Sequence, residues 1–343
     1  MKKIVYGICG IGLGHMYRQL PIIEELKKQA RIAIFAYGES LKFCERRFGD
    51  DKNIQVIPVA VPYVVGMPGG LSFKDSLAHA ANQQNFWEIN AKGMAQAQKF
   101  IGKPDAVLTD YEPVSAQYAY MYDAPLYTLD QQSKYLTGEF PEEFAGASLI
   151  DEVQRLRMFF PKAHKRIVFS FFDVPVRKAF KDEVTVVAPV LRKELQGLKR
   201  EVKKGSYLIY LSAQGGHRQS LKKIQKVCEA FPECSFHIFD GKSSNDRDFL
   251  AALATCEGVI STAGHSLMSE AVELGIPVYA MPLNLYEQQM NAFQIEKIGH
   301  GINKPIFTKE GFEAFKLFCK HYKPALKPEA FEAKNFIYKM INC

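Results

Sequence analysis

The stretch 261–277 holds the residues best suited to bind a phosphate. Apolar residues before it predict a strand, a small-residue turn follows, and apolar spacing then predicts a helix. Unpaired N–H groups at a helix N-terminus attract anions, which makes Gly264, His265 and Ser266 candidate phosphate contacts. Glu270, about one helical turn further on, is placed to reach a sugar hydroxyl beside the phosphates. Taken alone, the stretch is better explained as an ordinary strand, turn and helix with a serine cap.

A second glycine-bearing loop changes that assessment. It covers residues 211–217, after a predicted strand and before a predicted helix. Gly215 and its glycine neighbour permit close backbone approach to an anion, while Ser212 and Gln214 add polar groups. A plain strand-to-helix turn is the alternative. Two such loops on neighbouring strands of one sheet favour a diphosphate.

Polar side chains also follow the next predicted strand. Glu287, Gln288 and Gln289 lie in the run 282–292, and such a set of oriented donors and acceptors can hold several sugar hydroxyls. A polar helix N-terminus explains Glu287 but leaves the whole ordered set unexplained.

The first half of the chain offers a candidate base. Its first predicted strand is followed by a loop with Gly12 and Gly14 that ends at His15. The loop does not fit the dinucleotide fingerprint, and the second strand does not end on an acidic residue, so nicotinamide chemistry is disfavoured. His15 could activate an acceptor hydroxyl, with Asp110, at the end of the strand 106–109, fixing its tautomer. Capping of the next helix explains Asp110 about equally well.

Other polar residues predict no metal site. Asp246 and Asp248 open a predicted helix and are expected to serve its N-terminus. His164, His300 and His321 are isolated in the sequence and are expected at the surface. The seven cysteines are scattered without a paired motif, which predicts reduced thiols in a cytoplasmic protein.

The elements that must position these residues alternate between strand and helix through both halves, which predicts parallel sheets wrapped by helices. A charged segment, 192–205, is interpreted as the linker. We expect an acceptor-binding domain over 1–192, a donor-binding domain over 205–322 and a C-terminal helix over 323–343. A cleft at the carboxyl ends of both sheets is the expected site.

Composition sets further limits. The 343 residues carry 44 Lys and Arg against 37 Asp and Glu, a net charge of +7. This mild excess suits phosphate ligands or an anionic membrane surface. The basic runs are not interleaved with aromatic residues in a way that indicates nucleic acid. Because the sequence has no run of about 18 apolar residues, no membrane-spanning helix is expected.

Taken together, these motifs resemble the glycosyltransferase B (GT-B) fold, in the branch of the peptidoglycan N-acetylglucosaminyl transferase and the UDP-glycosyltransferases, including UDP-glucuronosyltransferase-like sequences. The resemblance rests on the glycine loop ending at His15, on Ser212 to Gly215, on 261–277, and on the run from Gln288 to Ala292. It implies two doubly wound α/β domains of the Rossmann type, with C-terminal helices that pack back on the first.

The resemblance also implies roles. Ser212, Gly215, Gly264, His265 and Ser266 would contact the diphosphate of a UDP-sugar, and Glu270 its ribose. Glu287, Gln288 and Gln289 would hold the transferred sugar. Phe239 would lie near the nucleotide base of the donor. His15 would be the catalytic base, with Asp110 as its partner, giving inversion without a metal or other cofactor.

Three functions remain open at this point. The leading one is an inverting glycosyltransferase acting on a hydroxyl acceptor, which could be a glycan, a small molecule or a lipid-linked molecule at the inner membrane face, in cell-envelope or polysaccharide synthesis. A UDP-sugar 2-epimerase of the same fold would need more cleft carboxylates and arginines than Asp110, Glu112 and Arg18 supply. A non-catalytic nucleotide-sugar sensor would keep binding without turnover.

Overall fold

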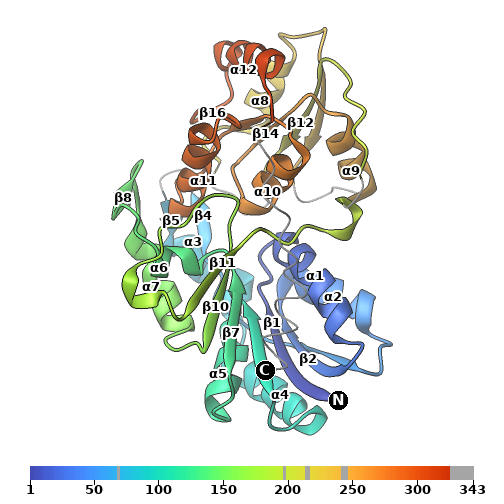
Figure 1. Cartoon of the computed structure of the whole chain (residues 1–343), viewed down its shortest axis with the longest axis vertical. Coiled ribbons are helices and arrows are strands. Elements are labelled where there is room, and N and C mark those ends of the chain that lie inside the picture. Colours follow the sequence, from blue (N-terminus) through green and yellow to red (C-terminus); the bar gives the residue numbers. More distant parts are fainter. Residues whose placement is uncertain (68–69, 196–197, 213–216, 241–245, 325–343) are drawn as a thin grey trace.

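Two parallel sheets, each wrapped by helices, form the two halves of the chain (Figure 1). The computed structural model describes residues 1–67, 70–195, 198–212, 217–240 and 246–324. No helix among these residues is long and apolar enough to cross a membrane.

The first half has a seven-stranded sheet in the order β11-β10-β7-β6-β1-β2-β3, with all neighbours parallel. Its strands are β1 Lys2–Ile8, β2 Ala30–Ala36, β3 Ile54–Pro58, β6 Ala106–Asp110, β7 Leu126–Asp130, β10 Lys165–Phe169 and β11 Val184–Val187. Its helices are α1 Gly14–Leu26, α2 Gly38–Phe48, α3 Phe73–Ala78, α4 Phe86–Phe100, α5 Pro113–Met121, α6 Ser133–Thr137 and α7 Leu149–Phe159. Two short hairpins, β4 Val65–Met67 with β5 Gly70–Ser72 and β8 Glu143–Phe144 with β9 Ala147–Ser148, complete it.

The second half has a five-stranded parallel sheet in the order β13-β12-β14-β15-β16. Its strands are β12 Ser206–Tyr210, β13 Ser235–Phe239, β14 Gly258–Ser261, β15 Val278–Ala280 and β16 Gly301–Asn303. Its helices are α8 Leu221–Cys228, α9 Asp246–Thr255, α10 His265–Leu274, α11 Tyr286–Lys297 and α12 Lys309–His321.

Both sheets reverse their strand order once, between β1 and β6 in the first and between β12 and β14 in the second. In open α/β sheets, ligands bind outside the carboxyl ends of the strands at such reversals. His15, Asp110, Ser212 and Gly264 lie at or just beyond the carboxyl ends of these four strands. The chain order therefore brings the predicted catalytic and donor residues to the binding positions of their sheets.

The local predictions differ from the structure in a few places. The sequence predicts a helix near 75–100, whereas the structure divides this segment into α3, a 3-10 turn and α4. The Asn85 side chain accepts from the Glu88 N–H at 3.1 Å and so starts a new helix. Helix α6 and strand β16 are too short to leave a sequence pattern. The predicted C-terminal helix, 323–343, lies outside the described residues from 325 onward.

The segment interpreted as the linker packs closely on the second half. Leu195 is buried in that half's core. The Arg200 guanidinium donates to the Cys256 carbonyl at 2.6 Å and to carbonyls at the end of α10. Positive charge at a helix C-terminus is favourable, which explains why this charged stretch is held against the protein.

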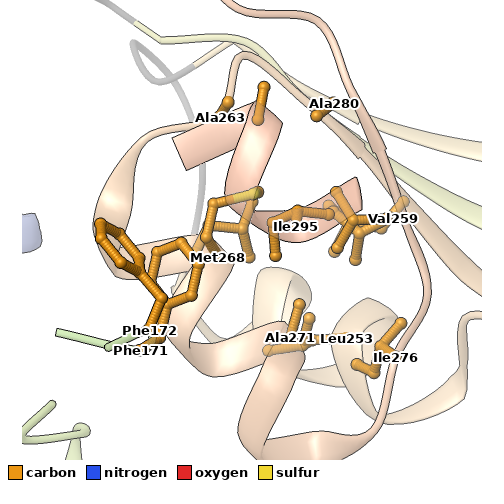
Figure 2. Close-up of a cluster of buried hydrophobic side chains, with 14 of the residues drawn as sticks. Phe171, Phe172, Leu253, Val259, Ala263, Met268, Ala271, Ile276, Ala280 and Ile295 are labelled. Carbon is orange, nitrogen blue, oxygen red and sulfur yellow. The ribbon is translucent and has the colours of Figure 1, made fainter. Parts of the chain in front are cut away.

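One hydrophobic cluster joins the two halves. Phe171 and Phe172, which follow β10 of the first sheet, pack among core residues of the second half (Figure 2). In that view both rings lie beside Met268 of α10. Core burial of this kind stabilises the two halves as a unit rather than as two separate bodies.

Candidate active site

The N-termini of α1 and α10 meet where the two halves face each other. Gly14 is the first residue of α1, and a Cβ added to it would lie 2.7 Å from Ser266 Oγ near the start of α10. Neither helix has a capping side chain or an acidic residue in its first turn. Two positive helix ends brought together in this way favour an anion between them.

His15 and Asp110 are in direct contact, as predicted. His15 Nδ1 lies 3.0 Å from Asp110 Oδ1, and the imidazole retains 14% exposure while the carboxylate is fully buried. Donation by Nδ1–H to the carboxylate leaves the Nε2 lone pair available to take a proton. The preceding loop turns sharply at Gly12, which has a φ of +71°.

Arg18, one turn beyond His15 on α1, shares the carboxylate. Its Nε donates to Asp110 Oδ2 at 2.7 Å, and an Nη atom donates to Oδ1 at 2.5 Å. That Nη also lies 2.7 Å from His15 Nδ1. The predicted pair is therefore a buried triad in which a fixed positive charge partly neutralises the aspartate.

A second set of hydrogen bonds fixes the aspartate in place. Gln19 Nε2 donates to Asp110 Oδ2 at 2.7 Å and to the Leu129 carbonyl at 3.0 Å, and Tyr6 donates to Gln19 Oε1 at 2.6 Å. Asp110 thus contacts His15 rather than capping α5, whose cap is Glu112, with bonds from the Val114 and Ser115 N–H groups.

The charges of this cluster set its protonation. Burial raises the pKa of Asp110, but Arg18 and His15 outweigh burial and bring it down to about 2. Burial and Arg18 lower the pKa of His15, but the Cys9 sulfur and Asp110 outweigh them and raise it to about 9. The imidazole is thus mostly protonated at neutral pH.

On the opposite side, the turn before α10 is strained. Ala263 has a φ of +63°, in the left-handed region that only glycine enters freely, and Asn291 Nδ2 donates to its carbonyl at 3.0 Å. Backbone strain of about 1–3 kcal/mol is typical of functional loops. Gly264, at the N-cap, follows this turn, and a Cβ built on it would meet no atom of the described residues within 4 Å.

His265 begins α10 and is buried. Its Nε2 has no hydrogen-bond partner among the described residues. Burial, together with the positive charges of Lys134, Arg18 and His15, holds the pKa of His265 well below its usual value, so the ring is neutral. His265 and Arg18 of the first half line the same hollow at the junction of the two halves.

Glu270 lies in a different environment from the open position that its predicted ribose contact suggests. It is buried, and its Oε1 accepts from Arg192 Nε at 2.8 Å. The Arg192 guanidinium also stacks 4.1 Å from the Tyr17 ring and 5.4 Å from the Phe249 ring. Arg192, the first residue of the segment interpreted as the linker, is therefore buried, with its charge paired and the plane of its guanidinium covered.

The predicted sugar-binding run begins α11. Gln288 Oε1 accepts from the Leu283 N–H at 3.0 Å, and Gln289 Nε2 donates to the Leu283 carbonyl at 3.1 Å. The two amides therefore shape the loop after β15. Glu287 is half-buried, with Asn291 Nδ2 at 3.4 Å from Oε1.

Of the four remaining donor candidates, the structure describes Ser212 and Phe239. Ser212 is half-buried after β12, and its carbonyl lies 2.7 Å from His217 Nε2. Phe239 ends β13 and packs on Phe249, with ring centroids 5.3 Å apart. Gln214 and Gly215 lie outside the described residues.

A small hollow opens between the halves. It is lined from the first half by Gly14, Tyr17 and Arg18, and from the second by His265, Ser266 and Glu270, among others. Residues predicted from separate motifs thus share one space.

The residues set aside in the sequence are mostly where they were expected. His164 and His321 are exposed. His300 is buried, contrary to the prediction, because its ring contacts the Ala271 carbonyl at 3.1 Å and Tyr322 Oη at 2.7 Å. The described residues contain no group of three potential metal ligands, and the six cysteines among them are all free.

Sequence reasoning missed three buried cations near the site: Arg18 as a partner of Asp110, Arg192 and Lys134. Arg18 lies three residues after His15, so helical spacing alone could have paired them. No comparable signal marked the other two, since they depend on contacts between distant segments.

The fold and its site define a class of protein. A UDP-glucose:anthocyanidin 3-O-glucosyltransferase, solved in complex with UDP, is similar over 99% of both chains, with a TM-score of 0.67 and 13% identity. The likeness establishes the GT-B architecture of two Rossmann-like domains.

The sequence profile of glycosyl transferase family 1 matches residues 2–316, and the chain belongs to that family. An uncharacterised glycosyltransferase of Methanosarcina mazei is 23% identical over 329 residues, covering 87% of this chain and 84% of the relative. One from Methanosarcina acetivorans is 22% identical with the same coverage. The protein is a glycosyltransferase.

Proposed function

We propose that this glycosyltransferase transfers a sugar from a UDP-sugar to a hydroxyl acceptor, with inversion at the anomeric carbon. The observation that carries the proposal is the His15–Asp110 contact, at 3.0 Å, lying opposite the uncapped N-terminus of α10. Similarity to a glucosyltransferase solved with UDP supports the choice of nucleotide.

In the proposed reaction, neutral His15 removes the proton of the acceptor hydroxyl through Nε2 as the oxygen attacks the anomeric carbon. The bond from that carbon to the diphosphate oxygen breaks, and UDP departs with the electron pair. Asp110 stabilises the imidazolium that forms. Gly264, His265 and Ser266 hold the diphosphate at the helix N-terminus, which offsets its charge without a metal.

The remaining donor contacts are proposed by position. Glu270, oriented by Arg192, takes the ribose, and Glu287 takes hydroxyls of the transferred sugar. Gln288 and Gln289 support that place through the Leu283 backbone. Ser212, Gln214 and Gly215 contact the diphosphate, and Phe239 lies at the uracil end.

The test has two arms. The purified protein is offered UDP-, GDP- and dTDP-sugars, and binding and nucleotide release are measured. We expect UDP-sugars to bind, and His15→Ala to lower turnover by about 10²–10⁴-fold while donor affinity stays within about twofold. His164→Ala, an exposed histidine, is the matched control. Absence of UDP-sugar binding, or full activity of His15→Ala, contradicts the proposal.

We also propose that the acceptor is lipid-linked and is met at the inner membrane surface. Three large apolar side chains of one segment are strongly exposed: Phe73 at 79%, Leu77 at 73% and Trp87 at 89%. Apolar groups this exposed favour an interface, and a net charge of +7 favours anionic lipid.

A further inference from the structure

Lys134 is the most unusual titratable group near the junction of the halves. It lies on α6, just beyond the end of β7, and its side chain is fully buried. Its Nζ has no hydrogen-bond partner among the described residues. An ammonium offers three donors, and leaving them unfilled away from water is costly.

The surroundings of Lys134 hold it in place without satisfying it. Nζ lies 4.6 Å from the Phe172 ring centroid and 5.3 Å from that of Tyr135. Asp130 fixes the start of α6 by accepting from Ser133 N–H at 2.6 Å and from Ser133 Oγ at 3.0 Å. The amine is therefore presented on a rigid support.

Ring contacts place Lys134 near both ends of the proposed donor site. The Phe172 ring beneath its Nζ lies 5.1 Å from the Phe171 ring, and Phe171 lies 5.3 Å from the ring of His265 at the start of α10. On the other side Tyr135 packs 5.5 Å from Tyr286, the first residue of α11 and the neighbour of Glu287. In line with this placement, Glu287 is the charged group that most strongly affects the pKa of Lys134, followed by Arg18, Asp130 and Glu152.

Neighbouring polar atoms share this lack of partners. Gln131 Oε1, Gln132 Oε1 and Tyr135 Oη, all on the same segment, are buried without a hydrogen bond within the described part of the chain. Native proteins rarely leave such groups unsatisfied, and where they do a ligand or water commonly supplies the bonds.

We propose that Lys134 binds an anionic group of the nucleotide-sugar donor, either its diphosphate or a carboxylate on the transferred sugar. The proposal rests on the proposed function, because the ligand is the UDP-sugar of that reaction. It assigns to the first half of the protein a direct contact with the donor.

Protonation supports this assignment. Burial lowers the pKa of Lys134 to about 7, partly opposed by Glu287. An anion beside Nζ raises that pKa again. Binding at pH 8 should therefore take up about one proton, whereas His15, with a pKa of about 9, is already largely protonated there.

The experiment compares wild type, Lys134→Met and the exposed-lysine control Lys92→Met by calorimetric titration with UDP, UDP-glucose and UDP-glucuronate. Loss of a charged hydrogen bond predicts roughly 10- to 100-fold weaker binding for Lys134→Met. Lys92→Met should bind the ligands as tightly as wild type. Equal weakening for all three ligands identifies the diphosphate. Weakening confined to UDP-glucuronate identifies the carboxylate. Titrations in buffers of different ionisation enthalpy should show that Lys134→Met loses the proton uptake.

Stability separates binding from a structural role. Replacing an unpartnered buried amine by an apolar group of similar length should leave the melting temperature of the ligand-free protein unchanged or raised. If Lys134→Met binds all three ligands as wild type does, the inference is overturned while the proposed function stands. If the wild type binds none of them, the proposed function fails and the inference fails with it.

Discussion

Asp110 accepts hydrogen bonds from three side chains at once, and the balance among them decides what His15 can do. Arg18 occupies both carboxylate oxygens, Gln19 one and His15 one. A carboxylate this well satisfied stays ionised, in line with its pKa of about 2. Its remaining negative charge still raises the pKa of His15, the proposed base.

The pH dependence of the reaction follows with a definite sign. The proposed base must be neutral to accept a proton, and the pKa of His15 is about 9, so kcat/KM should rise with pH along a limb well above 6.5. Asp110→Asn removes a charge that raises this pKa, so the limb should move to lower pH while the plateau falls, because the favoured tautomer is lost. Initial rates between pH 6 and 10 measure both. An unmoved limb would show that Asp110 does not control His15.

For single residues, the sequence predicted candidate site residues that lie at the carboxyl end of a strand. His15 and Asp110 were predicted because each follows an apolar run on a predicted sheet. Lys134 was not, since α6 has five residues and no periodic pattern. The environments of Glu270 and His300 were also out of reach, because their partners, Arg192 and Tyr322, lie 78 and 22 residues away.

Among the elements, α1 and α10 are the pair whose meeting assembles the site. The glycine that begins α1 leaves room for Ser266 of the other half. The spacing of apolar residues and the alternation of strands with helices predicted both helices. The sequence pattern predicted neither the contact between them nor the strained backbone at Ala263. Close approach of two segments from different halves depends on tertiary packing rather than on local propensity.

Gly14→Ala should therefore impair the reaction by separating the two helix ends. The added methyl would lie 2.7 Å from Ser266 Oγ, and a displacement approaching 1 Å can cost about 10²-fold in rate. We expect kcat/KM to fall by roughly 10- to 100-fold. Adding Ser266→Gly, which removes the clashing hydroxymethyl, should recover part of the loss relative to Ser266→Gly alone. Strictly additive effects in this double-mutant cycle would refute a steric origin.

For the whole molecule, the two halves are joined both by the site and by a common core. The alternation of strands and helices was sufficient to predict two parallel sheets and their facing carboxyl ends. It could not predict that Phe171 and Phe172 of the first half complete the core of the second (Figure 2). Two adjacent apolar residues such as these carry no sequence signal that shows which of the two sheets they will pack against.

Membrane contact is tested at this scale, since it depends on one face of the molecule and on its net charge. Wild type should pellet with vesicles containing anionic lipid, less so as salt rises. Trp87→Ser should lower the pelleted fraction severalfold, whereas Met158→Ser, equally apolar and 66% exposed on α7, should not. A wild type that stays in the supernatant at low salt would exclude the proposed surface.

Phe171 and Phe172 also bear on how the chain is made. Synthesis delivers the first sheet before any strand of the second exists, so these rings emerge without the surface that later covers them. Until α10 has been synthesised, the nascent chain exposes an apolar patch that is prone to aggregation and is suited to chaperone binding. Once covered, the same rings link the two halves in a single cooperative transition, so that a fragment ending near residue 192 should be the aggregation-prone species in expression.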